Sequence, residues 1–447
     1  MKETAIAIVR RLREAGYTAY CAGGCVRDLL RGVAAQDFDI ATSAAPDEVQ
    51  HLFPRTIPVG AAFGVVLVLE AGHQFEVATF RCDEAYLDGR RPSGVRYGSP
   101  EEDAQRRDFT INGLFLDPLT NQIFDFVDGR ADIERQLIRC IGDARHRFTE
   151  DKLRLLRCVR FASNLQFAIE PATLAAVGAM AGEIQVVSSE RIRDELSKIF
   201  TRPHAGTGLA LLNATGLLPV VLPEVAALKG VEQPAEYHPE GDVFTHTRMM
   251  LDALPAEPGL VLAWAVLLHD VGKPPTFVRA PDRIRFNDHD VVGQAMAEEI
   301  LRRLRFSNDE IEQIALCVGG HMRFQHVQSM RPAKLKRLLA RSTFPVELEL
   351  HRLDCLASHG KLDNYNFLKA TASAMPAEVI KPAPLVTGHD LMALGFTPGP
   401  LVGAVLKEVA ELQLEEQLQS PAAALDYARQ RLAGAMPSIP PAPSETD

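Results

Sequence analysis

Two aspartates separated by one residue, Asp37 and Asp39, stand in the stretch QDFDIAT. Because side chains alternate along a β-strand, a strand here places both carboxylates on one face and Phe38 and Ile40 on the other. Two carboxylates on one face repel each other unless a divalent cation lies between them, and their hard oxygen atoms suit Mg²⁺. Such ions lower the pKa of an attacking hydroxyl and hold phosphate oxygens during in-line displacement. The pair therefore predicts a magnesium site for nucleotidyl transfer.

The residues before this pair could hold a triphosphate. Gly23 and Gly24 form a tight turn whose backbone N–H groups have no Cβ in the way, and the run that follows begins a helix. Arg27 on that run is a bidentate partner for phosphate oxygens. Glu76, in the neighbouring strand-like segment FEVATF, is the candidate for a third carboxylate. An isolated Asp-x-Asp also occurs on solvated turns and strand edges, but its combination with GG-x-VRD favours the catalytic interpretation.

The elements that must position these residues alternate between helical and strand-like patterns from Met1 to about Phe126. Short strands rich in β-branched residues are predicted over 60–69, 74–80 and 114–126, the last as a hairpin that turns at 118–121. The polar segment 81–104 is long for a structureless connection, which is typical of a functional loop. From Asp132 onward nearly every segment has helical period. The predicted fold class is α+β, with a mixed sheet first and helices after it.

The composition of the 447-residue chain narrows its function. With 47% hydrophobic and 24% charged residues, the chain can bury large cores. A net charge of −10 argues against a surface that attracts nucleic acid everywhere, so any RNA site must be a local basic track. The apolar run 259–268 is too short to cross a bilayer and predicts a buried helix. Seven scattered cysteines and an N-terminus without a secretory signal indicate the cytoplasm and no membrane partner.

Several motifs together resemble one family. AGGCVRDLL and DFDIAT are followed by RRDFTING at 106–113, DFVDGRADIERQLIR at 125–139 and RFTEDKLRLLRCVRFA at 147–162. In this order they resemble class II tRNA nucleotidyltransferases, the family of CCA-adding enzymes and bacterial poly(A) polymerases. The resemblance implies a head of the polymerase-β type, followed by an all-helical neck and body. It also implies CTP and ATP as substrates and the 3′ end of tRNA as the partner.

The resemblance assigns roles within RRDFTING. Arg107 and Asp108 are expected to meet the phosphates and the ribose, and Asn112 to bond the sugar. An alternative for Asp108 is that it caps a helix N-terminus. In DFVDGRAD, Gly129 is expected to give an interdomain hinge backbone angles that other residues resist. The segment SSERIRDELSKIF at 188–200 resembles the family's last helical motif, for which we expect a structural role.

The motif EDKLR resembles the family's nucleotide-selecting motif. Spacings of three and four residues predict Glu150, Asp151 and Arg154 on one face of one helix, with Arg157 farther along it. By resemblance, Asp151 and Arg154 bond the base. Cytosine and adenine both present an amine donor beside a ring-nitrogen acceptor, whereas guanine and uracil present the opposite order, so a mispaired base leaves groups unsatisfied at about 1–3 kcal/mol each. Glu150 is expected to orient Arg154. The alternative is an exposed helix with salt bridges.

Basic helices are the candidates for the RNA track. They carry Arg157 and Arg160, which are also nucleotide-binding candidates, then Arg191 and Arg193, and the segment 331–341. For each residue taken alone, a solvated surface is the alternative.

A second set of residues has the order H…HD…D of the HD superfamily of metal phosphohydrolases: His246, His269 with Asp270, and Asp354. Imidazole and carboxylate groups from several helices suit one divalent ion, whose identity the residues leave open. His289 and His321 stand where two-metal members of that superfamily carry further ligands. The alternative for any one of these histidines is a hydrogen-bonded core residue.

These patterns divide the chain into a nucleotidyltransferase head (1–140), a helical neck for nucleotide selection and RNA binding (141–228), an HD-type helical domain (229–370), a helical tail (371–433) and a disordered tail (434–447). The predicted activity is template-independent addition of CMP and AMP to the tRNA 3′ end. A-only addition and poly(A) synthesis are alternatives within the class. An HD phosphohydrolase with an RNA-gripping N-terminal domain, and a non-enzymatic RNA-binding protein, are alternatives outside it.

Overall fold

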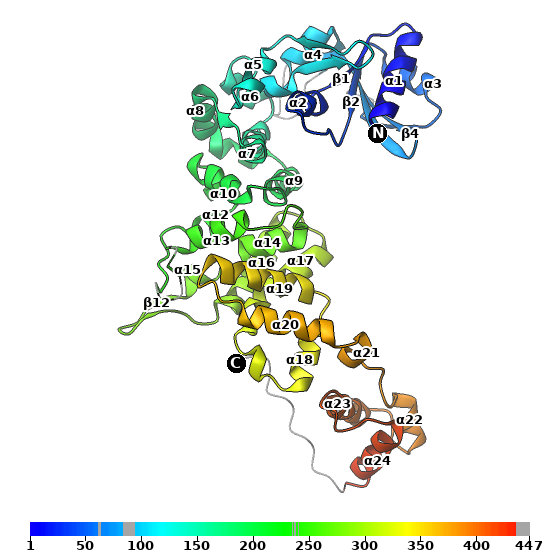
Figure 1. Cartoon of the computed structure of the whole chain (residues 1–447), viewed down its shortest axis with the longest axis vertical. Helices are drawn as coiled ribbons and strands as arrows, with labels where there is room; N and C mark the ends of the chain where they lie inside the picture. Colours follow the sequence, from blue (N-terminus) through cyan, green and yellow to red (C-terminus); the bar gives the residue numbers. More distant parts are fainter. Residues whose placement is uncertain (61–63, 84–93, 235, 237, 240, 435–447) are drawn as a thin grey trace. The chain divides into compact units, whose positions relative to one another are not determined.

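The computed structural model describes residues 1–434 apart from 61–63, 84–93, 235, 237 and 240. Within it the chain forms two compact units, Met1–Ala315 and Leu316–Asp447 (Figure 1). The predicted disordered tail lies almost entirely outside the described residues. The predicted division into five parts has boundaries that the two units do not test, and it stays a prediction.

The first unit begins with a mixed sheet. Its described strands follow the order β3-β4-β5-β2-β1-β8-β9. They are β1 (Ala19–Ala22), β2 (Asp39–Thr42), β3 (Thr56–Gly60), β4 (Val65–Glu70), β5 (His73–Thr79), β8 (Leu114–Asp117) and β9 (Gln122–Asp125). Strands β2 and β5 are parallel and the other pairs antiparallel. The predicted hairpin over 114–126 is confirmed, with Asn121 in the left-handed conformation at its turn (φ 60°).

Helices pack beside this sheet because their apolar positions recur at helical spacing. In α1 (Lys2–Glu14), the buried residues are Ala5, Ile8, Val9 and Leu12. The other helical segments are α2 (Gly24–Leu30), α3 (Pro46–Leu52), α4 (Pro100–Gln105), η2 (Thr110–Asn112) and α5 (Gly129–Glu134). Strands β6 (Arg81–Asp83) and β7 (Val95–Tyr97) pair antiparallel, and most of the predicted functional loop between them lies outside the described residues.

The conformation of Gly129 differs from the prediction. Its backbone has no positive φ angle, whereas the preceding Asp128 does (φ 59°). A Cβ atom on Gly129 would lie 2.2 Å from the carbonyl oxygen of Thr110. Glycine is therefore required here by the close approach of two backbone segments, because any side chain would overlap the Thr110 peptide.

The next part of the first unit is helical, as predicted. It comprises α6 (Ala144–Glu150), α7 (Arg154–Leu165), α8 (Pro171–Met180), α9 (Ser189–Phe200), α10 (Ala205–Ala214), α11 (Leu218–Val221) and α12 (Pro223–Ala226), with a short parallel pair β10 (Leu137–Ile138) and β11 (Ala168–Ile169). The predicted single helix across EDKLR is wrong. Asp151 has extended backbone angles (φ −143°, ψ 106°) and separates α6 from α7.

The remainder of the first unit is built around a buried helix. Segment 259–268 forms α14 (Leu260–Leu268), as the apolar run predicted, and its Trp264 is fully buried with the indole N–H donating to Ser197 Oγ at 3.1 Å. Its neighbours in the chain are α13 (Val243–Asp252), α15 (Lys273–Thr276), β12 (Phe277–Arg279), β13 (Ile284–Phe286), α16 (His289–Arg303) and α17 (Asn308–Gly320), which ends in the second unit. In the described part of the chain, no helix is long and apolar enough to span a membrane.

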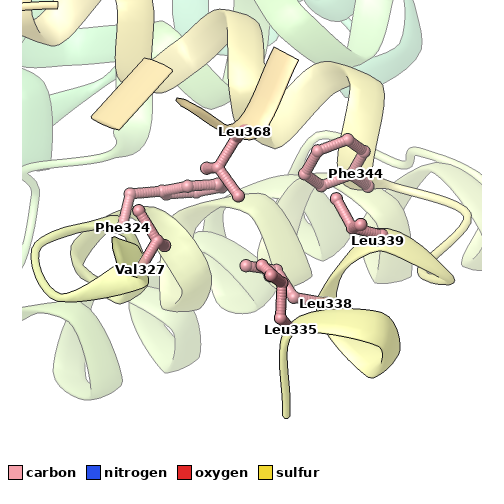
Figure 2. Packing of buried hydrophobic residues seen from close by; sticks show 7 residues of the cluster. All are labelled: Phe324, Val327, Leu335, Leu338, Leu339, Phe344 and Leu368. Carbon is pink, nitrogen blue, oxygen red and sulfur yellow. The ribbon is translucent and has the colours of Figure 1, made fainter. Parts of the chain in front are cut away.

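The second unit is helical. Its elements are η4 (His321–Phe324), η5 (Val327–Ser329), α18 (Pro332–Leu339), α19 (Phe344–Ala357), α20 (Asp363–Ala374), α21 (Ala377–Ile380), α22 (Gly388–Ala393), α23 (Pro400–Leu414) and α24 (Pro421–Leu432). Figure 2 shows one of its cores, in which Phe324, Phe344 and Leu368 face leucines of α18. A second cluster includes Val386, Leu391 and Val405.

Candidate active site

A cleft of about 790 Å³ in the first unit brings together every residue predicted for catalysis and nucleotide binding. The residues lie in the β1–α2 turn and α2, at the start of β2, on β5, in and just before η2, between α6 and α7, and on α7, and these segments are far apart in the sequence. They are Gly23, Gly24, Arg27, Asp37, Asp39, Glu76, Arg107, Asp108, Asn112, Asp151, Arg154, Arg157 and Arg160. The cleft also contains cations that were not predicted for nucleotide binding: Arg31, Arg81, Arg106, Arg191 and Arg202.

The acidic centre of the cleft lies at the start of β2. Phe38 and Ile40 are buried at 6% and 1% exposure, whereas Asp37 and Asp39 are exposed, so the predicted alternation is present. Asp37 itself precedes the strand. Because Ile40 pairs with Val77 in the parallel β2–β5 ladder, Glu76 lies beside Asp39. Carboxylates from two neighbouring strands therefore meet at one point.

The pKa of Asp39 is raised at this meeting point of carboxylates. It rises to about 6, first because the walls of the cleft displace part of the water around the carboxylate and then because Glu76 repels its charge. Asp37 adds a smaller repulsion, and Arg107 partly opposes the rise. A carboxylate whose pKa is raised by burial and by neighbouring negative charges is a place where a bound cation would relieve repulsion.

The glycine turn lies directly against a cleft cation. Gly23 has φ +71°, and its N–H donates to the carbonyl oxygen of Leu114 at 3.0 Å. A Cβ atom at this position would meet Arg107 Nη1 at 3.0 Å. Glycine is needed here for the backbone angle and for the approach of the guanidinium.

Arg107 is positioned by a residue that the sequence reasoning missed. Asp103, 1% exposed on α4, accepts from Arg107 Nε and Nη2 at 3.2 and 3.0 Å and from Arg106 Nε and Nη2 at 2.8 and 2.6 Å. Burial opposes ionisation of Asp103, but the two guanidinium groups lower its pKa below the usual value. Asp103 precedes Arg106 and Arg107 by three and four residues, the spacing at which side chains on a helix interact, and this spacing could have predicted the contact from the sequence.

Asp108 joins the head to α7. Its Oδ2 accepts from Arg157 Nε at 2.8 Å, and its Oδ1 accepts from Asn112 Nδ2 at 3.1 Å. Asn112 Oδ1 in turn accepts from Arg27 Nη1 at 2.8 Å. Burial would raise the pKa of Asp108, but Arg157 and Arg154 hold it well below the ordinary value. The helix-cap alternative is wrong, because Phe109 occupies the N-cap position of η2.

The two residues predicted to select the nucleotide, Arg154 and Asp151, are both held by ion pairs. Arg154 Nη1 donates to Glu150 Oε2 at 2.5 Å and to the Arg147 carbonyl oxygen at 2.9 Å, while its Nη2 donates to the Arg106 carbonyl oxygen at 3.0 Å. Glu150 thus contacts Arg154, as expected. Asp151 accepts from both terminal nitrogens of Arg191 on α9, at 3.2 and 2.8 Å. The α9 segment therefore contributes directly to the cleft.

The predicted RNA-track cations are bonded to protein acceptors. Arg160 donates to Glu195 at 2.6 Å, and Arg193 to Asp194 at 2.9 Å. In the second unit, Lys336 is 3% exposed and donates to Glu416 at 2.8 Å, so this lysine is not an exposed RNA contact. The RNA track as a whole stays a prediction.

Four residues of the predicted metal site belong to the first unit, on α13, the end of α14 and the start of α16. His246 and His269 have ligand atoms within 4.8 Å of each other, as do Asp270 and His289, and all four are buried. Nδ1 of His269 lies 2.8 Å from the Val266 carbonyl oxygen, and Nδ1 of His289 lies 2.8 Å from that of Phe286. A carbonyl at Nδ1 is the arrangement that leaves Nε2 for a metal.

Two further predicted ligands belong to the second unit. His321, 5% exposed, has Nδ1 2.6 Å from the Val318 carbonyl oxygen, and Asp354 is half-buried on α19. Their part in a metal site stays a prediction.

The mixed sheet and its carboxylate centre define the head of a nucleotidyltransferase, and comparisons with known proteins agree. Residues 19–139 match the family model "Poly A polymerase head domain", residues 166–229 match "Probable RNA and SrmB- binding site of polymerase A", and residues 290–428 match a model of domain 2 of tRNA nucleotidyltransferases.

A relative that matches nearly the whole chain shows the family. The CCA-adding enzyme of Lactobacillus johnsonii is 32% identical over 94% of this chain and 95% of its own length. That of Geobacillus kaustophilus is 46% identical over 50% of this chain and 55% of its own. A crystal structure of the Bacillus stearothermophilus CCA-adding enzyme in complex with CTP superposes with a TM-score of 0.73 at 27% identity, covering 97% of this chain and 98% of the other. The chain belongs to the CCA-adding enzyme family of tRNA nucleotidyltransferases.

Proposed function

We propose that this chain builds or repairs the 3′ CCA end of tRNA, adding CMP and AMP from CTP and ATP without a nucleic-acid template. The observation that carries the proposal is one cleft that contains an acidic centre, a glycine turn with arginines, and an Asp–Arg pair for the base. Further support comes from the Lactobacillus johnsonii relative, a CCA-adding enzyme that matches nearly the whole chain.

The acidic centre fits a divalent cation of the kind that nucleotidyltransferases use. Asp37, Asp39 and Glu76 offer only hard oxygen atoms, and the pKa of Asp39 is raised first by burial and then by repulsion from Glu76, which a cation would relieve. Mg²⁺ held by these residues would neutralise phosphate charge and favour deprotonation of the attacking 3′-hydroxyl. Arg27 and Arg107 bind the triphosphate oxygens, which orients the α-phosphate for in-line attack and the pyrophosphate for departure.

Base selection falls to Asp151 and Arg154. The carboxylate accepts from the exocyclic amine of cytosine or adenine, and the guanidinium donates to the adjacent ring nitrogen. Uracil and guanine would set acceptor against acceptor and donor against donor, which costs about 1–3 kcal/mol for each unsatisfied group. Arg157 and Arg160 line the same cleft and extend its positive charge towards the nucleotide and the RNA end.

The test uses two RNAs, tRNA that ends before CCA and tRNA that ends in CC, each given CTP, ATP, UTP and GTP separately with Mg²⁺. We expect CMP on the first RNA, AMP on the second, and no product with UTP or GTP. An enzyme that adds only A would extend the CC-ended RNA alone, and a poly(A) polymerase would add long A tracts to both. Absence of any extension by CTP or ATP refutes the proposal.

A second candidate function rests on two buried pairs of ligand residues, His246 with His269 and Asp270 with His289, which the 3.1 Å contact of His269 Nε2 with Asp270 Oδ2 joins into one cluster. We propose that this cluster binds a divalent ion of the HD type, and that the bound ion supports hydrolysis of phosphomonoesters or cyclic phosphates. The purified wild-type chain should retain a divalent ion after dialysis, and His269→Ala should lose it.

Paired variants separate the two activities. Asp37→Ala should abolish tRNA extension and retain the ion, whereas His269→Ala should lose the ion and any phosphatase activity but extend tRNA normally. Loss of extension in both variants would refute two independent sites. If only His269→Ala changed a product, the HD activity would be the principal one. If neither variant changed any product, the chain would be a non-enzymatic RNA-binding protein.

A further inference from the structure

Two hydrogen bonds join Arg191 to Asp151, the carboxylate that is proposed to bond the base. Its terminal nitrogens donate to Asp151 Oδ1 and Oδ2 at 3.2 and 2.8 Å, in a bidentate arrangement. Both residues line the cleft and are largely buried, with side chains 25% and 19% exposed. Arg191 belongs to α9, whose Ile192, Leu196 and Ile199 are anchored in the core. The guanidinium is therefore held on a fixed helix and is not a mobile surface charge.

The acceptor capacity of Asp151 is nearly filled by these bonds. A carboxylate oxygen has two lone-pair sites, so Asp151 offers four in all. Oδ1 accepts from Arg191 and also from the backbone N–H of Leu153 at 3.1 Å. Among the residues that the structure describes, Arg191 is the one donor to Oδ2. One acceptor site, on Oδ2, remains, and one exocyclic N–H of cytosine or adenine would fill it.

We propose that Arg191 is a positioning residue that determines base specificity, by fixing the Asp151 carboxylate so that a single acceptor faces the nucleotide. This inference rests on the proposed function and replaces the RNA-contact role predicted from the basic character of α9. A fixed acceptor rejects uracil and guanine, because it cannot turn away from a carbonyl oxygen on the base. Without Arg191 the carboxylate gains two acceptor sites and rotates, which relieves that repulsion.

The loop between α6 and α7 makes this support necessary. Asp151 lies outside both helices, so no helical backbone fixes its side chain. Arg154 differs, since three protein acceptors already hold its guanidinium. The bidentate fork of arginine supplies two parallel bonds, and lysine cannot reproduce them.

The experiment compares wild type with Arg191→Met, Arg191→Lys and the control Arg302→Met. Arg302 also pairs with a carboxylate, Glu298 at 3.7 Å, on the exposed face of α16 and outside the cleft. Single-nucleotide addition to CC-ended and CCA-lacking tRNA gives kcat and KM for ATP and CTP, and for UTP and GTP as wrong substrates. Equilibrium binding of CTP without RNA gives the affinity directly.

We expect Arg191→Met to raise KM and Kd for CTP and ATP up to about tenfold with little change in kcat, because an Asp151 carboxylate that Arg191 no longer holds must be ordered when the nucleotide binds, and this cost is the same in the ground and transition states. The preference for CTP over UTP should fall by a similar factor. Arg191→Lys should recover part of both losses, and Arg302→Met should match wild type. Unchanged selectivity in an Arg191→Met chain that still extends tRNA would overturn the inference. Failure of wild type to extend tRNA would instead refute the proposed function.

Discussion

Replacement of Asp39 by asparagine should stabilise the metal-free chain while it abolishes tRNA extension. The amide has nearly the shape of the carboxylate but none of the charge that Glu76 and Asp37 repel. The pKa of Asp39 is 3.8 in an unperturbed carboxyl and about 6 in the folded chain, so folding at neutral pH works against its ionised form. The ionised Asp39 carboxylate therefore lowers the free energy of unfolding of the metal-free chain.

The size of the effect follows from the pKa shift. At about 1.4 kcal/mol for each pKa unit, the full shift corresponds to about 3 kcal/mol. Because the Asp39 side chain is exposed to the cleft, solvent screens much of this repulsion, and we expect about 1 kcal/mol. For a chain of this size that amounts to about 2 °C in the midpoint of thermal unfolding.

The assay is thermal unfolding in EDTA between pH 4 and pH 8, with Asp426→Asn as the control. Asp426 is 64% exposed and forms an ion pair with Arg429 at 2.6 Å on the surface of the second unit. The advantage of Asp39→Asn should be complete well above pH 6, shrink as the pH falls through 6, and be small at pH 4, close to the pKa of 3.8 of the unperturbed carboxyl. Added Mg²⁺ should stabilise wild type and leave Asp39→Asn unchanged. A variant less stable than wild type at pH 8, or equal stabilisation of both by Mg²⁺, would refute the reasoning.

Two other substitutions test the framework around the cleft. Asp103→Asn leaves Arg106 and Arg107 without the buried carboxylate that holds them. The free energy of unfolding, measured by urea denaturation, should fall by about 3–5 kcal/mol, and the affinity for CTP should fall as well. Unchanged stability and affinity would exclude Asp103 as the support of these arginines. Gly129→Ala forces a Cβ atom against the Thr110 carbonyl oxygen and should cost about 1–3 kcal/mol in the same measurement. Gly403→Ala, in the helix α23 with open space around it, should instead gain up to about 1 kcal/mol. Equal effects of the two alanines would contradict the steric explanation.

Features that depend on local chemistry could be predicted from the sequence. The alternation of polar and apolar residues in DFDIAT predicted which side chains face the cleft. The turn residues at 118–121 predicted the β8–β9 hairpin. The apolar run at 259–268 identified the buried helix α14. In each case one short segment contains all of the information, because the period of the side chains follows from the backbone geometry alone.

Features that depend on tertiary contacts could not be predicted in the same way. Helical spacing placed Asp151 and Arg154 on one helix, but the bonds of Asp151 to Arg191 and to the Leu153 N–H accompany a break in that helix. The sequence predicts that Gly129 gives an interdomain hinge backbone angles that other residues resist, whereas the Thr110 peptide that excludes a side chain there is distant in the sequence. Contacts of this kind become visible only when the strands and helices are assembled.

The measurement that tests the account most directly is sequencing of the 3′ ends made by wild type and by Asp37→Ala from tRNA that lacks CCA, with CTP, ATP, UTP, GTP and Mg²⁺ all present. The account predicts ends that read CCA and stop there for wild type, and unextended RNA for Asp37→Ala. Ends that contain uridine or guanosine, or equal extension by the two proteins, would contradict the claim that the acidic centre and the base-reading pair of this cleft carry the activity.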